Sequence, residues 1–254
     1  MATRRALVAG LVGLAAVGAV LLASLGRGTP GDVVRVDFDG EPGVMVTSPA
    51  VAGQARARAE LVASGEAQVL VVPGSPGGGT AARMPGRSAE GVAVIGVSTR
   101  GVVDRLSPGE EDFTFGAEVL ADPGVDEDGD NIVQRGLADD LGQYKLELDG
   151  DRYACTVLGT EGRVTASLET SLTRSVWYGV SCTRDGDTLR LTVRQLGAPE
   201  SWTAVSTGPI GSVVTASAAT PMSIGGKLTP MGEIAAWQPD QFHGIIDAVF
   251  LRIG

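Results

Sequence analysis

The sequence predicts an all-β protein: a jelly-roll β-sandwich of two antiparallel sheets, preceded by an N-terminal hydrophobic helix. Three observations favour this fold class. Short runs of alternating apolar and polar residues recur about every ten residues along the chain. Turn signals separate these runs, and 37 glycines and 13 prolines suit a chain of many short strands. After the N-terminal segment, only residues 54–64 resemble a short helix.

The first half of the chain contains two predicted strands. In residues 33–38, Val34, Val36 and Phe38 alternate with two charged residues, which is typical of a half-buried strand. Residues 68–72 form a short apolar run. The Gly/Pro-rich stretch at 73–79 could be a domain linker, but strands flank it, so we interpret it as a loop within one domain.

The second half holds the clearest strand patterns. Residues 245–253 are apolar on both faces, as expected of a central strand that is covered from both sides. Asp149-Gly150 and residues 184–187 are turn signals. The alternating runs are 113–119, 144–149, 153–157, 164–168, 178–182 and 189–194.

Composition and charge limit the function. Apolar residues at 43% and charged residues at 20% are ordinary for a globular protein, and 254 residues allow one large β domain or two small ones. The formal net charge is −10. An acidic chain repels phosphate backbones, which argues against nucleic-acid binding and against adsorption to anionic lipid.

The N-terminus has the pattern of a targeting segment. Arg4 and Arg5 precede an uncharged apolar run over residues 6–25. We interpret residues 1–26 as a signal peptide, cut most plausibly after Gly26, or as an uncleaved signal anchor. Residues 27–31 are then a linker, and residues 32–254 are the β-sandwich. Either alternative predicts a secreted or membrane-anchored protein whose β domain is extracytoplasmic.

The chain has two cysteines, and in an exported protein they are most simply a disulfide between Cys155 and Cys182. The loop that it would close holds 28 residues, for which chain entropy predicts about 3.5 kcal/mol of stabilisation. Two buried free thiols are the alternative. A zinc site is disfavoured because the chain has one histidine and no second cysteine pair.

Several segments after residue 112 follow one another in a recognisable order. They read DFTFGAEV, NIVQRG, GQYKLELDG, WYGVSCTRDGDTLRLTV, MSIGGKL and FHGIIDAVFLRI. This order resembles the laminin-G-like, or concanavalin A-like lectin/glucanase, superfamily. The opening VVRVDFDGEPG also resembles the first strand of that superfamily, whose partner is the closing strand. The resemblance covers most of residues 31–254 and is clearest over 112–254.

The resemblance leaves three functions open, because the superfamily includes sugar binders, protein-binding modules and glycoside hydrolases. A hydrolase of this kind needs two carboxylates that face one cleft. The resemblance implies a Glu-x-Asp-x-x-Glu strand, and the nearest string places Glu147 and Asp149 on one strand face without the last Glu. A solvent-facing stripe that ends in a turn explains this pair better, so no catalytic residue is assigned.

The acidic loop at residues 126–131 is the best candidate for a metal site. Calcium prefers several carboxylate and carbonyl oxygens on a flexible loop, and Asp126, Asp128, Asp130 and Asn131 could supply them. The loop resembles the start of an EF-hand, but Leu137 stands where the bidentate Glu would be. A solvated acidic turn is the alternative.

Exposed aromatic residues would be the contacts for a sugar. Trp177 begins a predicted strand and is expected in the core, whereas Trp202 and Trp237 lie in irregular segments and are the candidate ligand-binding residues. His243 is the only histidine, and it is expected to be structural rather than catalytic. The sequence therefore predicts a non-catalytic recognition module that binds carbohydrate or a cell-surface protein through edge loops. If the acidic loop holds Ca²⁺, the ion would assist this binding. The alternatives are a hydrolase or lyase of the same superfamily and a structural cell-envelope protein.

Overall fold

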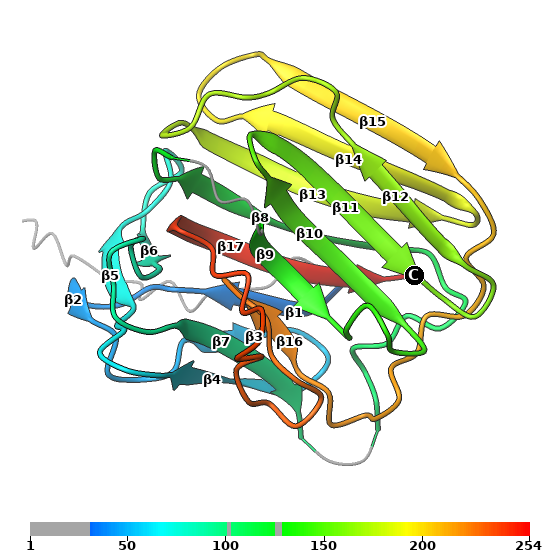
Figure 1. Ribbon diagram of the computed structural model, residues 1–254, viewed down its shortest axis with the longest axis horizontal. Helices are drawn as coiled ribbons and strands as arrows, with labels where there is room; N and C mark the ends of the chain where they lie inside the picture. The colour runs from blue at the N-terminus through cyan, green and yellow to red at the C-terminus, as the bar shows by residue number, and fades with distance from the viewer. Residues whose placement is uncertain (1–30, 101–102, 125–128) are drawn as a thin grey trace, which may run out of the picture.

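A computed structural model describes residues 31–100, 103–124 and 129–254. Within these residues the protein is a β-sandwich of two antiparallel sheets without an α-helix, which confirms the predicted fold class (Figure 1). The predicted N-terminal hydrophobic helix lies outside the described residues. None of the described segments is a helix long and apolar enough to cross a membrane.

The larger sheet, sheet A, contains ten of the strands that the described residues form. Its order is β15-β14-β13-β8-β17-β6-β5-β2, and β1 pairs with both β17 and β3. Its strands are β1 (Asp32–Asp37), β2 (Gly43–Val44), β3 (Ala50–Ala52), β5 (Leu70–Pro73), β6 (Thr80–Arg83), β8 (Phe113–Ala121), β13 (Trp177–Asp185), β14 (Thr188–Gln195), β15 (Ser201–Thr207) and β17 (Gly244–Ile253).

The smaller sheet, sheet B, contains seven strands in the order β12-β11-β10-β9-β16-β7-β4. Its strands are β4 (Ala57–Ala63), β7 (Ala93–Thr99), β9 (Asp130–Arg135), β10 (Gln143–Asp149), β11 (Arg152–Leu158), β12 (Arg163–Ser167) and β16 (Met222–Ile224).

The first and last described strands pair with each other, as the resemblance implied. Val36 of β1 lies opposite Val249 of β17, and both are fully buried. The strands between them in the first hundred residues join both sheets, because β2, β3, β5 and β6 add to sheet A while β4 and β7 add to sheet B. The Gly/Pro-rich stretch connects the paired strands β5 and β6, so it is a loop within the sandwich.

The core lies between the sheets, and its residues are the apolar members of the alternating runs. Phe115 and Tyr144, from β8 and β10, meet with ring centroids 5.0 Å apart. Cys155 of β11 and Cys182 of β13 form the predicted disulfide, with a Cα–Cα distance of 6.1 Å and no exposed surface. The bridge therefore joins sheet B to sheet A through the core.

One local ambiguity is resolved and one local prediction was wrong. Residues 54–64, the one stretch that resembles a short helix, form no helix, because residues 57–63 pair with β7 over their whole length as β4. The closing strand is central in sheet A but is not covered on both sides, since Phe250 and Arg252 on its outer face line a hollow. Pairing with β7 decided the first case, and the absence of a layer of described residues over this hollow decided the second; local sequence reveals neither.

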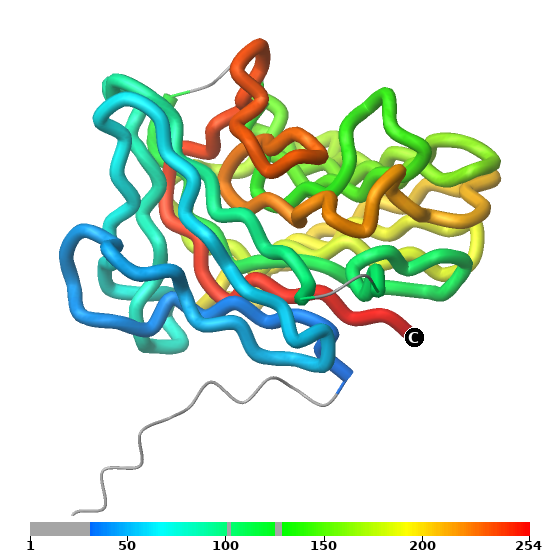
Figure 2. Tube along the Cα trace, turned by 90° about the horizontal axis from the view of Figure 1, so that it is seen from below, coloured from blue at the N-terminus to red at the C-terminus, as the bar shows by residue number. Residues whose placement is uncertain are grey.

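A long segment between β16 and β17 packs on the outer side of sheet B beside β9. It is the orange-to-red chain that lies outside the sandwich in Figure 2. The backbone N–H of Asn131 donates to the carbonyl of Asp240, and that of Gly225 donates to Ile132. This packing explains why all six residues of β9 are buried.

Candidate functional site on the outer face of sheet A

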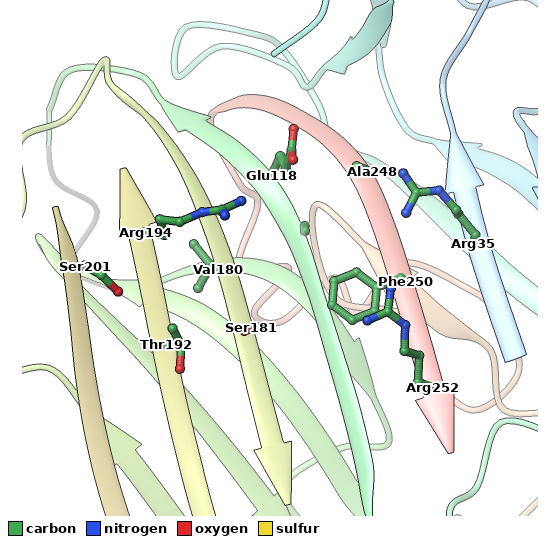
Figure 3. A pocket seen from close by; sticks show the side chains of 12 residues that line it. Arg35, Glu118, Val180, Ser181, Thr192, Arg194, Ser201, Ala248, Phe250 and Arg252 are labelled. Carbon is green, nitrogen blue, oxygen red and sulfur yellow. The ribbon is translucent and has the colours of Figure 1, made fainter. Parts of the chain in front are cut away.

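The outer face of sheet A carries a hollow of about 320 Å³ over β8, β13, β14 and β17, which we call the sheet A hollow (Figure 3). Strand register builds it. Glu118 of β8 lies opposite Gly179 of β13, which lies opposite Arg194 of β14, which lies opposite Ser201 of β15. Its lining residues are Arg35, Ala117, Glu118, Gly179, Val180, Ser181, Thr192, Arg194, Ser201, Ala248, Phe250 and Arg252.

Gly179 forms the floor of the hollow, because a strand whose outward residue is glycine has no side chain to fill it. A second outward glycine, Gly116 of β8, lies beneath the Phe250 ring. At Gly116 a methyl group would lie 2.9 Å from the Phe250 ring and 2.4 Å from the Val180 carbonyl. At Gly179 it would meet Leu196 at 3.3 Å, and Arg194 lies just beyond at 3.9 Å. The ring and the guanidinium therefore border a floor of backbone.

Two charged groups in the hollow have no partner within the described part of the chain. Glu118 and Arg194 form no hydrogen bond or ion pair with another described residue or with each other. Figure 3 shows the Arg194 side chain extended over β13 toward β8, the strand that carries Glu118. A carboxylate and a guanidinium thus stand on opposite sides of the glycine floor with their hydrogen-bonding capacity unused.

The other arginines of the hollow are held in place. Arg35 Nε donates to Asp37 Oδ1 at 3.0 Å on the same strand. Arg252 Nε donates to Asp32 Oδ1 at 2.6 Å, and its guanidinium carbon lies 4.5 Å from the centre of the Phe250 ring. The Arg252 guanidinium therefore lies over one face of the Phe250 ring, and the rest of the ring lines the hollow.

A β-bulge in β17 borders the hollow. Its register with β8 shifts between Asp247 and Phe250, and Ala248 has a φ of 50°, which is unusual for a residue other than glycine. Asp247 stabilises this conformation, because its Oδ1 accepts from the Ala248 N–H at 2.7 Å and its Oδ2 from the Ser75 N–H at 3.4 Å. Bulges and strained residues of this kind are enriched at functional sites.

A second, more polar hollow of about 360 Å³ adjoins the first and shares Arg35, Glu118 and Ala248 with it. Asp247 lines it. Burial is the main cause that raises the pKa of Asp247 to about 6; the two backbone N–H groups lower it, and the charges of Glu118 and Asp37 raise it further. Burial likewise raises the pKa of Asp37.

The sequence-predicted carboxylate pair lies on the other sheet. Glu147 and Asp149 are on the outer face of β10 in sheet B, where Asp149 is exposed beside the turn and Glu147 pairs with Lys145 at 2.5 Å. Neither residue lines the sheet A hollow or the polar hollow beside it. Only Asp149 of the pair faces solvent, because the side chain of Glu147 is 16% exposed.

The predicted metal loop is described only in part. Asp126 and Asp128 lie outside the described residues. Asp130 is buried, and its Oδ2 accepts from Arg87 at 3.4 Å and from Arg174 at 3.5 Å. Asn131 donates to Gln134 inside the fold. Among residues 31–100, 103–124 and 129–254, no group of three or more His, Cys, Asp and Glu could hold a metal ion.

The two candidate tryptophans differ in environment. Trp202 does not lie in an irregular segment, because it pairs with Val193 as part of strand β15. It is half-buried against the core, and its ring meets Tyr178 edge-on at 6.1 Å. Trp237 is 70% exposed on the segment that packs on sheet B. Trp177, expected in the core, is only half-buried. His243 is buried, with Nδ1 2.8 Å from the Pro85 carbonyl oxygen.

Sequence reasoning missed the residues of the sheet A hollow. Glu118, Arg194 and Phe250 were recognised only as members of strands, and nothing in one strand tells which other strand lies beside it. The available signal was a polar residue on the outward face of each strand together with glycines at Gly116 and Gly179, where side chains are expected.

Comparisons with known proteins bear on the fold. No protein-family model matches the chain, and no curated protein matches it. Among solved structures, it is similar to the binding domain of botulinum neurotoxin serotype C1, with 10% identity over 88% of this chain and 48% of that chain at a TM-score of 0.58.

Two further structures have the same kind of likeness. The binding domain of botulinum neurotoxin DC, solved with rat synaptotagmin II, is 9% identical over 88% of this chain and 48% of that chain, with a TM-score of 0.57. Tailspike protein 2 from Escherichia coli O157:H7 bacteriophage CAB120 is 12% identical over 76% and 25%, with a TM-score of 0.51. The chain thus spans about half of the neurotoxin domains and a quarter of the tailspike. At these identities the likeness establishes a β-sandwich fold and nothing finer.

Proposed function

We propose that the protein is an extracytoplasmic, non-catalytic recognition module that binds carbohydrate in the sheet A hollow. One observation carries the proposal: Glu118 and Arg194, both without a partner among the described residues, flank a glycine floor beside the Phe250 ring. A sugar ring has hydroxyls that donate and accept hydrogen bonds and an apolar face. A carboxylate accepts, a guanidinium donates, and an aromatic ring packs against the apolar face.

The hollow also has the composition expected of a small-ligand site. Its lining combines the Phe250 ring and Val180 with a few polar groups, Ser181, Thr192 and Ser201 among them. This proposal places the ligand on the face of sheet A, whereas the sequence suggested that the ligand binds at edge loops. A surface protein is the alternative ligand.

Binding to immobilised polysaccharides and oligosaccharides, followed by calorimetry on those retained, tests the proposal. We expect Glu118→Gln and Arg194→Gln each to weaken binding at least about tenfold, since each removes one charged hydrogen-bond partner. Glu169→Gln and Arg58→Gln are matched controls at exposed positions outside the hollow. Retention of no glycan, or equal binding by all four variants, would overturn the proposal.

One observation favours a second candidate, a glycoside hydrolase. Asp247 and Glu118 are neighbouring carboxylates, and the pKa of Asp247 is raised to about 6, as a general acid requires. Against it, Asp247 is only 8% exposed and both its oxygens accept backbone N–H groups. We therefore expect no new reducing ends when retained glycans are incubated with the protein; release abolished by Asp247→Asn would favour the hydrolase.

We further propose that the β domain is exported. A disulfide persists in oxidising compartments, and Cys155–Cys182 is such a bond. Export would follow from the N-terminal segment. N-terminal sequencing of protein recovered from its host tests this: a chain that begins after residue 26 is a cleaved, secreted protein, one that begins at Met1 or Ala2 in the membrane fraction is anchored, and recovery in the cytoplasm contradicts export.

A further inference from the structure

Strand β15 presents an unpaired edge at the rim of sheet A. All seven of its residues pair with β14 on one side, without a register shift. On the other side no described strand pairs with it, and Figure 1 shows it at the outer border of the sandwich. Alternate backbone N–H and C=O groups along that border therefore point away from the sheet.

This edge lacks the protection that sheet edges normally carry. Natural edge strands are short, charged, bulged or contain proline, because an exposed regular edge pairs with another chain. β15 reads SWTAVST, with no charge, glycine or proline. The other borders differ: β4 carries Arg58 and Glu60, β12 begins with Arg163, and β2 and β3 have only two and three residues.

We propose that a second copy of this chain pairs with β15, antiparallel to it, across a two-fold axis at Ala204. This register places Thr203 opposite Val205 of the second copy and Ser201 opposite Thr207 of the second copy. Threonine, serine and valine side chains suit cross-strand neighbours. The strand is uncharged although the chain carries a net charge of −10, so strands from two copies meet without like charges opposite each other.

The pairing has a functional consequence, which rests on the proposed function. Because the two-fold axis is perpendicular to the sheet, both sheet A hollows lie on one continuous face. The two hollows lie about 30 Å apart. This distance combines five strand spacings, measured across the sheet from β13 to β13 of the second copy, with an offset of six residues along the strands. A glycan of repeating units that spans this distance engages both hollows, and avidity then exceeds the affinity of either one.

Sedimentation velocity of the full 254-residue chain over a range of concentrations tests the pairing. We expect a concentration-dependent species of twice the 25.9 kDa monomer mass. The double substitution Thr203→Lys with Val205→Lys places lysines opposite each other at the axis, on exposed positions, and should weaken dimerisation by about tenfold or more. Val46→Lys with Leu141→Lys adds the same charge at exposed positions elsewhere and should leave it unchanged.

Two results would overturn the pairing: a wild-type chain that stays monomeric at all concentrations, or a lysine variant of β15 that dimerises like the control. A thermal melt that matches the control shows that the β15 variant is folded. A failure of the proposed function gives a different result. A chain that dimerises but retains no glycan supports the β15 pairing and contradicts only the proposal that the sheet A hollow binds carbohydrate. Binding to multivalent but not monovalent glycan should fall with the β15 variant.

Discussion

Asp247 of β17 lies directly opposite Glu118 of β8, so two carboxylates are cross-strand neighbours on the outer face of sheet A. Their environments differ. Asp247 is buried at the bulge and accepts two backbone N–H groups, whereas Glu118 has no partner among the described residues. One carboxylate therefore maintains the shape of the site, and the other is available to a ligand.

The raised pKa of Asp247 predicts how stability varies with pH. The pKa is 3.8 for an ordinary Asp and about 6 here, chiefly because of burial. Between those values the folded state holds a proton that the unfolded state has lost, so the free energy of unfolding falls as pH rises from about 4 to about 6. Asp247→Asn keeps an acceptor for the Ala248 N–H, loses the acceptor for the Ser75 N–H and removes the charge, so the free energy of unfolding of this variant should lack the decrease.

Urea unfolding at several pH values measures this effect. Asp149→Asn, at an exposed turn in sheet B, is the matched control and should follow the wild-type profile. Parallel profiles for wild type and Asp247→Asn would contradict the assignment.

The inter-sheet disulfide should be a major source of stability. Cys155→Ser with Cys182→Ser is expected to lower the free energy of unfolding by about 3.5 kcal/mol, since the bridge restricts a 28-residue loop in the unfolded chain. Denaturant unfolding of the oxidised wild type against the variant measures the loss. A difference below about 1 kcal/mol would show that the sheets are held together without the bridge.

Most of the fold could be predicted from sequence, because alternation and turn residues are local signals. The alternating run around Cys155 and Cys182 gave the strands and, with the exported context, the bridge. Residues 57–63 were ambiguous, because Arg58, Glu60 and the neighbouring alanines fit either a helix or a strand locally. Only pairing with β7 selects a strand for this segment.

The candidate site could not be predicted in the same way. Glu118, Gly179 and Arg194 come from three strands, and what brings them into one row is the register between those strands. A shift of one residue in any of the three would turn its side chain to the other face. Register is fixed by the whole sandwich, so the hollow appears only after the sheets are assembled.

The buried ion pair between Arg135 and Asp104 should contribute more to the free energy of unfolding than an exposed ion pair does. Arg135 is fully buried, and its Nη2 donates to Asp104 Oδ1 at 2.9 Å. Asp104→Ala leaves a buried guanidinium without its counter-ion and should cost about 3 kcal/mol. Glu60→Ala removes the exposed partner of Arg58 and should cost less than about 1 kcal/mol. Chemical unfolding of both variants compares them, and equal losses would contradict the difference in burial.

Calcium is expected to have little effect on stability. A calcium ion at Asp130 would compete with the guanidinium groups of Arg87 and Arg174, which already hold that buried carboxylate. Melting curves in excess calcium and in EDTA should therefore coincide. A rise of several degrees with calcium, lost in Asp130→Asn, would instead support the site that the loop sequence suggested.

Substitutions of the two candidate tryptophans should have different effects on the stability of the protein, and neither tryptophan is expected to contact the glycan. Trp202 packs on Tyr178, so Trp202→Ala should cost about 2 kcal/mol of stability, less than for a fully buried tryptophan. Trp237 is largely exposed, and Trp237→Ala should change stability by less than about 0.5 kcal/mol. Because Trp237 lies on the segment outside sheet B and the hollow lies on sheet A, Trp237→Ala should also leave glycan binding unchanged, whereas Phe250→Ala should weaken it. The reverse result, with binding lost at Trp237 and kept at Phe250, would place the ligand at the segment that packs on sheet B.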